Sequence, residues 1–327
     1  MSLRWTPRSV ERCDVRLPTV ETLDAYRAIY HREDLWRPAV EEICARHALP
    51  GDKCLRGPDG THVVYFVGST AVVKLFVPLF ESDFLSERMV APVMDGRLDV
   101  ATPAIVAEGE IEGWRYLILT RVQGRPVEGV WSELSMDDRR RVIRQVGEFI
   151  ARVGEMPLDG LESLAVDWDA FVPARVAARE QESSAVRAGL AQGIPPYVDS
   201  SPLSRKGAFP PVLLLSDITR EHVMVDRAGD SWRLVGYVDF GDAMIGPREY
   251  ELVAPGVEMV RGDRELLREL LVASGYNDDQ LNEELEHRLM TCTLLHRYLT
   301  LPDLMSLIPE ARAATSVDEL AGIVWPM

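Results

Sequence analysis

The sequence predicts an α+β protein of two lobes, a small N-terminal lobe built on an antiparallel sheet and a larger, mainly helical C-terminal lobe. Short apolar runs separated by turn residues dominate the chain up to residue 122, which is typical of antiparallel strands. Helical periodicity dominates residues 123–327, apart from one hairpin pattern with carboxylates at its end. The two predicted domains are therefore residues 1–122 and residues 123–327.

The first lobe is expected to open with a lead-in over residues 1–16, which shows no periodicity. A helix over 33–47 follows, because Trp36 and Val40 recur on one helical face. Turn residues then divide the chain into strands. The expected elements are strands over 62–67 and 71–76, a short helix that starts at Ser82 and includes Glu87, and strands over 105–108 and 114–120.

The second lobe is expected to follow a hinge at Gly124-Arg125-Pro126. Its clearest helix covers residues 135–153, because Ser135 and Asp138 resemble a capping box and six apolar residues form one stripe. That stripe predicts core packing and not a binding surface. Further helices are expected over 168–187, 264–274, 279–301 and 317–324.

The candidate catalytic residues of the second lobe lie at the ends of an apolar strand and of the hairpin that follows it. The strand over 212–215 leads to Asp217, and a turn over 226–230 joins strands over 223–225 and 232–238. Antiparallel strands joined by a tight turn bring their outer ends together, so Asp217, His222 and Asp239 are expected to converge. Phosphoryl transfer uses such carboxylates, one to deprotonate a hydroxyl and others to hold Mg²⁺. The alternative is that these aspartates are ordinary turn residues.

Lys74 stands in the middle of an apolar strand, Val72-Val73-Lys74-Leu75-Phe76. A buried ammonium group is costly unless it is paired, and phosphate groups or a helix glutamate would pair it. Glu87 is the expected partner and Glu81 the second choice. The alternative is an edge strand with Lys74 facing solvent. An earlier loop, Gly57-Pro58-Asp59-Gly60-Thr61-His62, lies between the first two strands and ahead of Lys74. The backbone of Gly60 and Thr61 is expected to contact a nucleotide, and the alternative is an ordinary turn.

The composition restricts the partners of the chain. Asp and Glu total 52 against 36 Lys and Arg, which gives a net charge of −16. Such a field repels nucleic acid and anionic membranes and attracts cationic small molecules, although acidity also serves solubility alone. The four scattered cysteines favour free thiols in a reducing cytoplasm over disulfides or zinc. We expect a cytoplasmic protein with no nucleic-acid, membrane or protein partner. Hydrolase, zinc-protease and dinucleotide-binding motifs are absent from the sequence.

The order of lysine strand, helix glutamate, hinge, catalytic aspartate and Asp239-Phe240-Gly241-Asp242 resembles the aminoglycoside phosphotransferase and choline kinase group. The resemblance covers roughly residues 20–326. Within that group, the segments around Trp36, Arg261 and Val317 and the run Thr293-Leu294-Leu295-His296 are most similar to hygromycin B 7″-kinases of actinomycetes. The resemblance implies a two-lobed, protein kinase-like fold and an enzyme that phosphorylates a small-molecule hydroxyl, with aminoglycoside resistance as its role.

The resemblance also implies a nucleotide site that binds ATP, or GTP, together with Mg²⁺. Lys74 would hold the phosphates, with Glu87 as its partner. The backbone groups of Thr120 and Val122 would contact adenine. The expected crevice between the two lobes would contain this site.

The resemblance assigns the remaining residues to catalysis. Asp217 would be the catalytic base and Asp239 a Mg²⁺ ligand. Asp242 would lie near the acceptor or a second metal ion. Glu251 matches a carboxylate that usually braces the catalytic loop.

Two positions depart from the group's usual H-G-D-x-x-x-x-N motif. Leu215 and Ser216 replace the histidine and glycine, so the orientation of the loop must come from elsewhere. His222 replaces the asparagine. It would bind a metal through nitrogen, donate to a phosphate, or mark the loss of the second metal ion. A kinase of another metabolite, such as an amino alcohol or a sugar, and a nucleotide-binding pseudokinase are the alternative functions.

Overall fold

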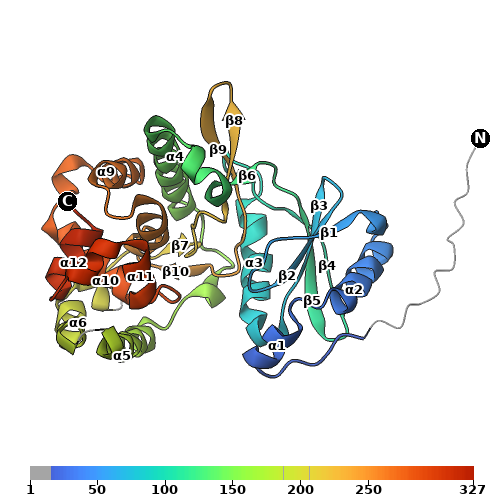
Figure 1. Ribbon diagram of the computed structural model, residues 1–327, viewed down its shortest axis with the longest axis horizontal. Coiled ribbons are helices and arrows are strands. Elements are labelled where there is room, and N and C mark those ends of the chain that lie inside the picture. Colours follow the sequence, from blue (N-terminus) through green and yellow to red (C-terminus); the bar gives the residue numbers. More distant parts are fainter. Residues whose placement is uncertain (1–15, 187, 206) are drawn as a thin grey trace, which may run out of the picture. The chain divides into compact units, whose positions relative to one another are not determined.

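The computed structural model describes residues 16–186, 188–205 and 207–327 (Figure 1). The described chain forms two compact units. The first contains the residues up to Phe84 and Ala104–Arg121, and the second contains Leu85–Pro103 and Val122–Met327. The α+β class, with one antiparallel-sheet unit and one mainly helical unit, is confirmed. The expected lead-in over residues 1–16 lies almost entirely outside the described residues.

The division between the units differs from the expected one at residues 85–103. These residues group with the second unit, although they precede the last strands of the first. Ala101 forms a parallel bridge with Gly236, and the hydroxyl of Ser86 donates to the carbonyl of Phe240 at 2.8 Å. These contacts join residues more than 130 positions apart, and the local sequence pattern used to predict the boundary gives no sign of them. The boundary falls inside helix α3 (Glu81–Met94).

The first unit is built on a five-stranded antiparallel sheet with the order β1-β2-β3-β5-β4. Strand β2 alternates between buried and half-buried residues, as expected for a sheet with one covered face. Strand β3 lies at the centre, between β2 and β5, so the edge-strand alternative for Lys74 is wrong. The strands are β1 (Cys54–Arg56), β2 (Val63–Val67), β3 (Ala71–Leu75), β4 (Ile105–Ile111) and β5 (Trp114–Thr120).

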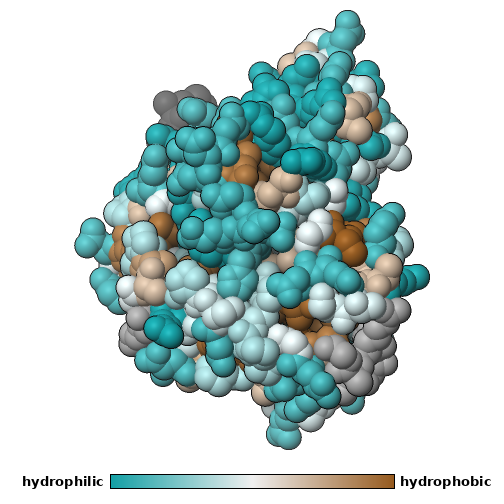
Figure 2. Space-filling view, turned by 90° about the vertical axis from the view of Figure 1, so that its left-hand side faces the viewer, coloured by the Kyte–Doolittle hydropathy of each residue, from teal (hydrophilic) through white to brown (hydrophobic). Residues whose placement is uncertain are grey.

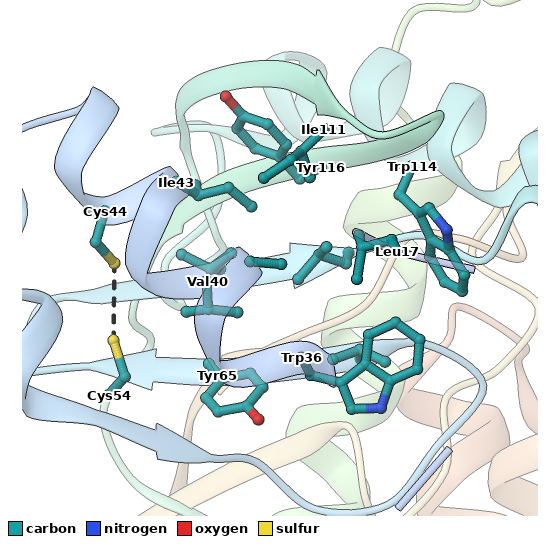
Figure 3. Close-up of a cluster of buried hydrophobic side chains, with 14 of the residues drawn as sticks. Leu17, Trp36, Val40, Ile43, Cys44, Cys54, Tyr65, Ile111, Trp114 and Tyr116 are labelled. Atoms are coloured by element: carbon teal, nitrogen blue, oxygen red, sulfur yellow. Dashed lines mark hydrogen bonds between the residues drawn. The ribbon is translucent and has the colours of Figure 1, made fainter. Parts of the chain in front are cut away.

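Two helices and the sheet enclose the core of the first unit. The expected helix is α2 (Glu33–Arg46), and the shorter α1 (Leu23–Ile29), which begins at the N-cap Thr22, was not predicted. Figure 3 shows the apolar side chains of α2 against Tyr65 and Tyr116 of the sheet. The thiols of Cys44 and Cys54 lie 3.7 Å apart in this core, as free thiols.

The second unit contains two small sheets. The predicted hairpin is present as β8 (Val223–Ala228) and β9 (Ser231–Tyr237), which project together in Figure 1. The expected hinge residues instead form strand β6 (Arg125–Pro126), which pairs with β8. Strand β7 (Val212–Leu214) pairs separately with β10 (Met244–Gly246).

Helices make up most of the second unit. Helix α4 (Met136–Gly154) begins at Ser135, whose hydroxyl accepts the N–H of Asp138, and its apolar stripe is buried as predicted. It packs on α9 (Arg264–Ala273), beside it in Figure 1. The other helices are α5 (Trp168–Val186), α6 (Ala188–Ser200), α7 (Arg248–Glu251), α8 (Val253–Pro255), α10 (Glu283–Leu295), α11 (Leu301–Leu307) and α12 (Val317–Val324).

The single helix expected over residues 279–301 is wrong. Helix α10 ends at Leu295, and His296 has the extended backbone angles φ −61° and ψ 135°. A new helix, α11, begins after the capping box at Thr300. This break allows the side chain of His296 to leave the helical path, which matters for the site described below.

The described part of the chain has no helix that is both long enough and apolar enough to cross a membrane. Figure 2 shows one face of the molecule as mainly hydrophilic, with small and separate hydrophobic areas.

Candidate active site

The end of the β8–β9 hairpin brings His222 beside Asp217, as predicted. Val223 pairs with Tyr237 in the sheet, and the N–H of Val238 donates to the carbonyl of His222 at 3.0 Å. The Nδ1 atom of His222 lies 2.9 Å from the main-chain oxygen of Asp217 and 3.2 Å from its carboxylate Oδ2. The hydroxyl of Thr219 is also 3.2 Å from Nδ1. Because both oxygens of Asp217 are acceptors, Nδ1 carries a proton, and the lone pair of a neutral ring is on Nε2.

Tyr237 is close enough to the four predicted carboxylates of this unit for their charges to act on it. Its hydroxyl donates to the main-chain oxygen of Asp217 at 3.2 Å. Burial, followed by the negative charges of Asp217, Glu251, Asp239 and Asp242, raises the pKa of Tyr237 well above its ordinary value. The side chain of Tyr237 therefore stays neutral and can act as a hydrogen-bond donor at neutral pH.

Asp217 is itself in a partly desolvated position. Burial raises the pKa of its carboxyl group, the charge of His222 lowers it, and the charge of Asp239 raises it. A raised pKa makes a carboxylate a better proton acceptor, provided that it is ionised at the working pH. The geometry around Asp217 suits a general base.

The loop that precedes Asp217 is held by Glu251. The N–H groups of Leu215 and Ser216 donate to the two carboxylate oxygens of Glu251, each at 2.9 Å. Glu251 is only 3% exposed, and burial raises its pKa to about 7 although the two N–H donors lower it. Ser216 has φ 68°, a left-handed conformation that costs about 1 kcal/mol for a residue other than glycine.

The loop from Asp239 to Asp242 has its own supports. Asp239 is also left-handed, with φ 77°, and its carboxylate accepts the N–H of Gly241 at 2.9 Å. Aspartate tolerates this conformation better than most residues because its short side chain bonds locally. The buried hydroxyl of Ser86 holds the carbonyl of Phe240.

Lys74 lies on the central strand of the first unit and is 5% exposed. Its Nζ atom lies 5.1 Å from the centroid of the Phe76 ring, which provides a cation–π contact. Glu87 is 1% exposed, on the part of α3 that groups with the second unit. The Lys74–Glu87 pair joins residues of different units and stays a prediction.

The backbone groups of Gly60 and Thr61, which were predicted to contact a nucleotide, already have side-chain partners. The N–H of Gly60 donates to the hydroxyl of Tyr30 at 2.8 Å, and the hydroxyl of Tyr26 donates to the carbonyl of Thr61 at 2.9 Å. Helix α1 and the residue after it therefore anchor this loop. A phosphate contact from the N–H of Gly60 would have to displace the bond to Tyr30.

The proposed adenine contacts lie at the end of strand β5. The N–H of Thr120 donates to the carbonyl of Ala104, and its hydroxyl accepts the N–H of Ala104, both at 2.9 Å. Val122 is the first residue of the second unit after this strand, and it is buried. Contacts between these two residues and a nucleotide stay predictions.

A cavity of about 150 Å³ opens beside Asp217 within the second unit. Its lining includes three carboxylates, those of Asp217, Glu258 and Asp303, together with His296 and Tyr298. Glu258 comes from a π-helical turn, η6 (Gly256–Val260), and burial raises its pKa. A cavity of roughly 150 Å³ has room for one six-membered ring.

Sequence reasoning missed Ser86, His296 and the acidic lining. His296 was expected to lie inside the helix predicted over residues 279–301. It is 3% exposed, and its Nε2 atom lies 3.1 Å from the carbonyl oxygen of Ser216. The position of His296 in a run similar to the hygromycin B kinases was the only signal, and that run does not reveal which side chain turns inward.

The predicted metal residues, Asp239 and His222, stay predictions. Within residues 16–186, 188–205 and 207–327, no group of three or more His, Cys, Asp or Glu side chains is arranged to hold a metal ion alone. The carboxylates whose charges act on Tyr237 provide oxygen donors of the kind that suits Mg²⁺.

Comparisons with known proteins agree with this description. Residues 53–285 match a family model described as "Phosphotransferase enzyme family". The structure is similar to the GDP complex of aminoglycoside 2'-phosphotransferase-IIIa, with a TM-score of 0.64, 18% identity and coverage of 80% of this chain and 92% of that one. It is also similar to the streptomycin–ATP complex of APH(2")-IIa, with a TM-score of 0.55, 15% identity and coverage of 86% and 96%. A third similar structure is APH(3'')-Id from Streptomyces rimosus, with a TM-score of 0.51, 14% identity and coverage of 77% and 96%.

Proposed function

Since the chain belongs to the phosphotransferase enzyme family, and is thereby a small-molecule kinase, we propose that it transfers the γ-phosphoryl group of ATP or GTP to a hydroxyl of an aminoglycoside. The observation that carries the proposal is the carboxylate of Asp217 on the wall of a small acidic cavity. Hygromycin B is the acceptor that the sequence resemblance favours, and resistance to it is the proposed role.

Asp217 is the proposed general base. Its carboxylate accepts the proton of the acceptor hydroxyl, whose oxygen forms a bond to the γ-phosphorus while the bond to the β–γ bridging oxygen breaks. The contacts from His222 and Tyr237 fix the peptide of Asp217 and one carboxylate oxygen, which supports this role. Positioning and electrostatic stabilisation supply most of the rate in such reactions.

The proposed acceptor class follows from charge and size. Glu258 and Asp303 place two further carboxylates around the cavity, which would bind protonated amines. Tyr298 is 52% exposed and lines the cavity, where its aromatic ring would pack against a sugar ring. The cavity has room for one ring, so the remaining rings of an aminoglycoside would lie outside it. The net charge of −16 adds long-range attraction for such cations.

The nucleotide is proposed to bind through Lys74, buried on its strand, with Glu87 as partner and with backbone contacts at Thr120, Val122 and the Gly60-Thr61 loop. Asp239 and Asp242 offer the hard oxygen donors that suit Mg²⁺, with His222 as a further candidate ligand through Nε2. Bound Mg²⁺ would neutralise phosphate charge. Two of the three similar solved structures contain a nucleotide, GDP in one and ATP in the other, which supports a nucleotide in this fold.

The proposal is tested by measuring nucleotide consumption with a panel of kanamycin, gentamicin, streptomycin and hygromycin B, and with amino alcohols and sugars beside them. The phosphate is then located on the product by NMR. We expect Mg²⁺-dependent transfer to at least one aminoglycoside, and a loss of roughly 10³-fold or more in kcat for Asp217→Asn.

Three outcomes would contradict the proposal. Unchanged turnover of Asp217→Asn with the best acceptor would exclude Asp217 as the base. Transfer only to an amino alcohol or a sugar would reassign the acceptor. Binding of ATP–Mg²⁺ by calorimetry, without transfer to any acceptor, would identify a pseudokinase, especially if His222→Asn restored activity.

A further inference from the structure

Ser216, the residue before Asp217, is held from both sides of its backbone. Its left-handed conformation, φ 68°, persists only where the surroundings fix it. The carboxylate of Glu251 accepts its N–H at 2.9 Å, and the ring of His296 lies 3.1 Å from its carbonyl oxygen. These two contacts come from segments 35 and 80 positions later in the chain. Together they determine where the next residue, Asp217, points.

The hydrogen bonds of His296 settle which ring nitrogen carries the proton. The N–H of Leu299 donates to Nδ1 at 3.2 Å, so Nδ1 is the acceptor of a neutral ring. Nε2 is therefore protonated and donates to the carbonyl of Ser216. The ring is stacked on Tyr250, with centroids 5.1 Å apart and an interplanar angle of 19°. Burial lowers the pKa of His296 to about 4, which keeps the ring neutral at physiological pH.

The backbone of His296 is held as firmly as its ring. Arg175 and Arg179 of α5 both donate to the carbonyl oxygen of His296, at 2.8 and 2.6 Å. Arg179 also donates to the carbonyl of Leu294 and to Glu182. A buried guanidinium group is costly unless its donors are used, so these bonds fix the end of α10 against α5. The position of the imidazole is thus determined before any substrate binds.

We propose that His296 is a positioning residue for Asp217, and that it supplies from the end of α10 the loop orientation that Leu215 cannot give. It acts through the carbonyl of Ser216 and has no part in proton transfer. This inference rests on the role of Asp217 in the proposed function. His296 also lines the cavity, so the experiments must distinguish the positioning role from a role in acceptor binding.

Two substitutions each keep one of the two hydrogen bonds of the His296 ring and remove the other. The amide nitrogen of His296→Gln reaches the place of Nε2 and can still donate to Ser216. The amide oxygen of His296→Asn replaces Nδ1 as the acceptor for Leu299 and leaves Ser216 without a donor. His287→Asn is the matched control, because His287 lies in α10, the helix that precedes His296, and its Nε2 donates to another backbone carbonyl, that of Tyr197, at 3.0 Å.

The first measurement is amide hydrogen exchange of the substrate-free protein, which does not depend on activity. In His296→Asn we expect exchange at Leu215 and Ser216 to accelerate on the order of tenfold, which corresponds to about 1.4 kcal/mol. His296→Gln and His287→Asn should keep the protection of the wild type at these two amides. Equal protection in His296→Asn and the wild type, or a uniform loss over the whole second unit, would overturn the proposal.

The second measurement is steady-state phosphoryl transfer to the best acceptor of the panel. A positioning role predicts a kcat roughly tenfold lower for His296→Asn, an unchanged KM for the acceptor, and recovery in His296→Gln. A raised acceptor KM with unchanged kcat would assign His296 to acceptor binding and overturn the proposal. If the wild type transfers phosphate to nothing, the proposed function fails, and the exchange experiment still decides whether His296 orients the loop.

Discussion

Replacing Glu251 with glutamine should lower the activity of the protein while raising its stability at high pH relative to the wild type. The carboxylate accepts two backbone N–H groups, from Leu215 and Ser216, in a fully buried position. An amide has one acceptor oxygen, so its NH₂ group would face one of the two N–H groups. We expect a loss of about 2 kcal/mol in the orientation of the loop, which corresponds to a kcat roughly thirtyfold lower.

Glu251 also makes the stability of the wild type depend on pH, and the glutamine variant lacks this dependence. The pKa of Glu251 is raised from 4.5 to about 7, chiefly by burial. The folded form therefore holds its proton more tightly than the unfolded form. The stabilising contribution is fully present below pH 4.5 and is lost as the pH rises through 7. Linkage gives a decrease of about 2.5 kcal/mol between pH 5 and pH 8 from this group.

Urea unfolding at pH 5 and pH 8, for the wild type and Glu251→Gln, measures the contribution of Glu251 to the free energy of unfolding. Other titrating groups are common to both proteins, so the difference between the two pH responses isolates Glu251. The variant should gain about 2.5 kcal/mol relative to the wild type on going from pH 5 to pH 8, while its kcat stays low throughout. Parallel pH responses, or an unchanged kcat, would refute the account of Glu251.

Three further substitutions test particular contacts. Ser216→Gly should raise the free energy of unfolding by about 1 kcal/mol, because it removes both the left-handed strain and a buried hydroxyl without a hydrogen-bond partner; Ser216→Ala keeps the strain and should gain less. Gly147→Ala should lower the free energy of unfolding, measured by heat or urea, by about 2 kcal/mol, because its Cβ would lie 2.6 Å from the carbonyl oxygen of Leu270 in α9. The control is Gly154→Ala in the same helix. Its Cβ would meet nothing closer than 4.0 Å, so the stability should hardly change. Asp303→Asn keeps an acceptor for its helix cap and should raise the acceptor KM about tenfold with the nucleotide KM unchanged; equal shifts in both KM values would argue against its place in the acceptor site.

Local signals predicted the elements whose residues form their own pattern. Helix α4 was predicted because Ser135 caps its first turn and its stripe recurs at helical spacing. Helix α6 was not predicted, because Pro195 and Pro196 argue against a helix, and burial of Ile194 and Val198 outweighs that cost.

Part of the candidate site followed from the same local reasoning. The closeness of Asp217 and His222 follows from the rule that a hairpin brings its outer ends together, and the structure has them in contact. The turn of His296 out of α10 depends on Ser216, Arg175 and Arg179, which no local pattern connects to it. Long-range hydrogen bonds of this kind are the part of the site that one sequence does not reveal.

The bond between His296 and Ser216 restricts how this protein can be recombined with its relatives. It joins positions 80 residues apart, one beside the proposed base and the other at the wall of the proposed acceptor cavity. A chimera that took the chain beyond Tyr250 from a relative with a different residue at position 296 would keep every carboxylate up to Asp242 and lose the donor to Ser216. Exchange of the acceptor-binding region to alter substrate choice must therefore carry the Leu215-Ser216 loop with it.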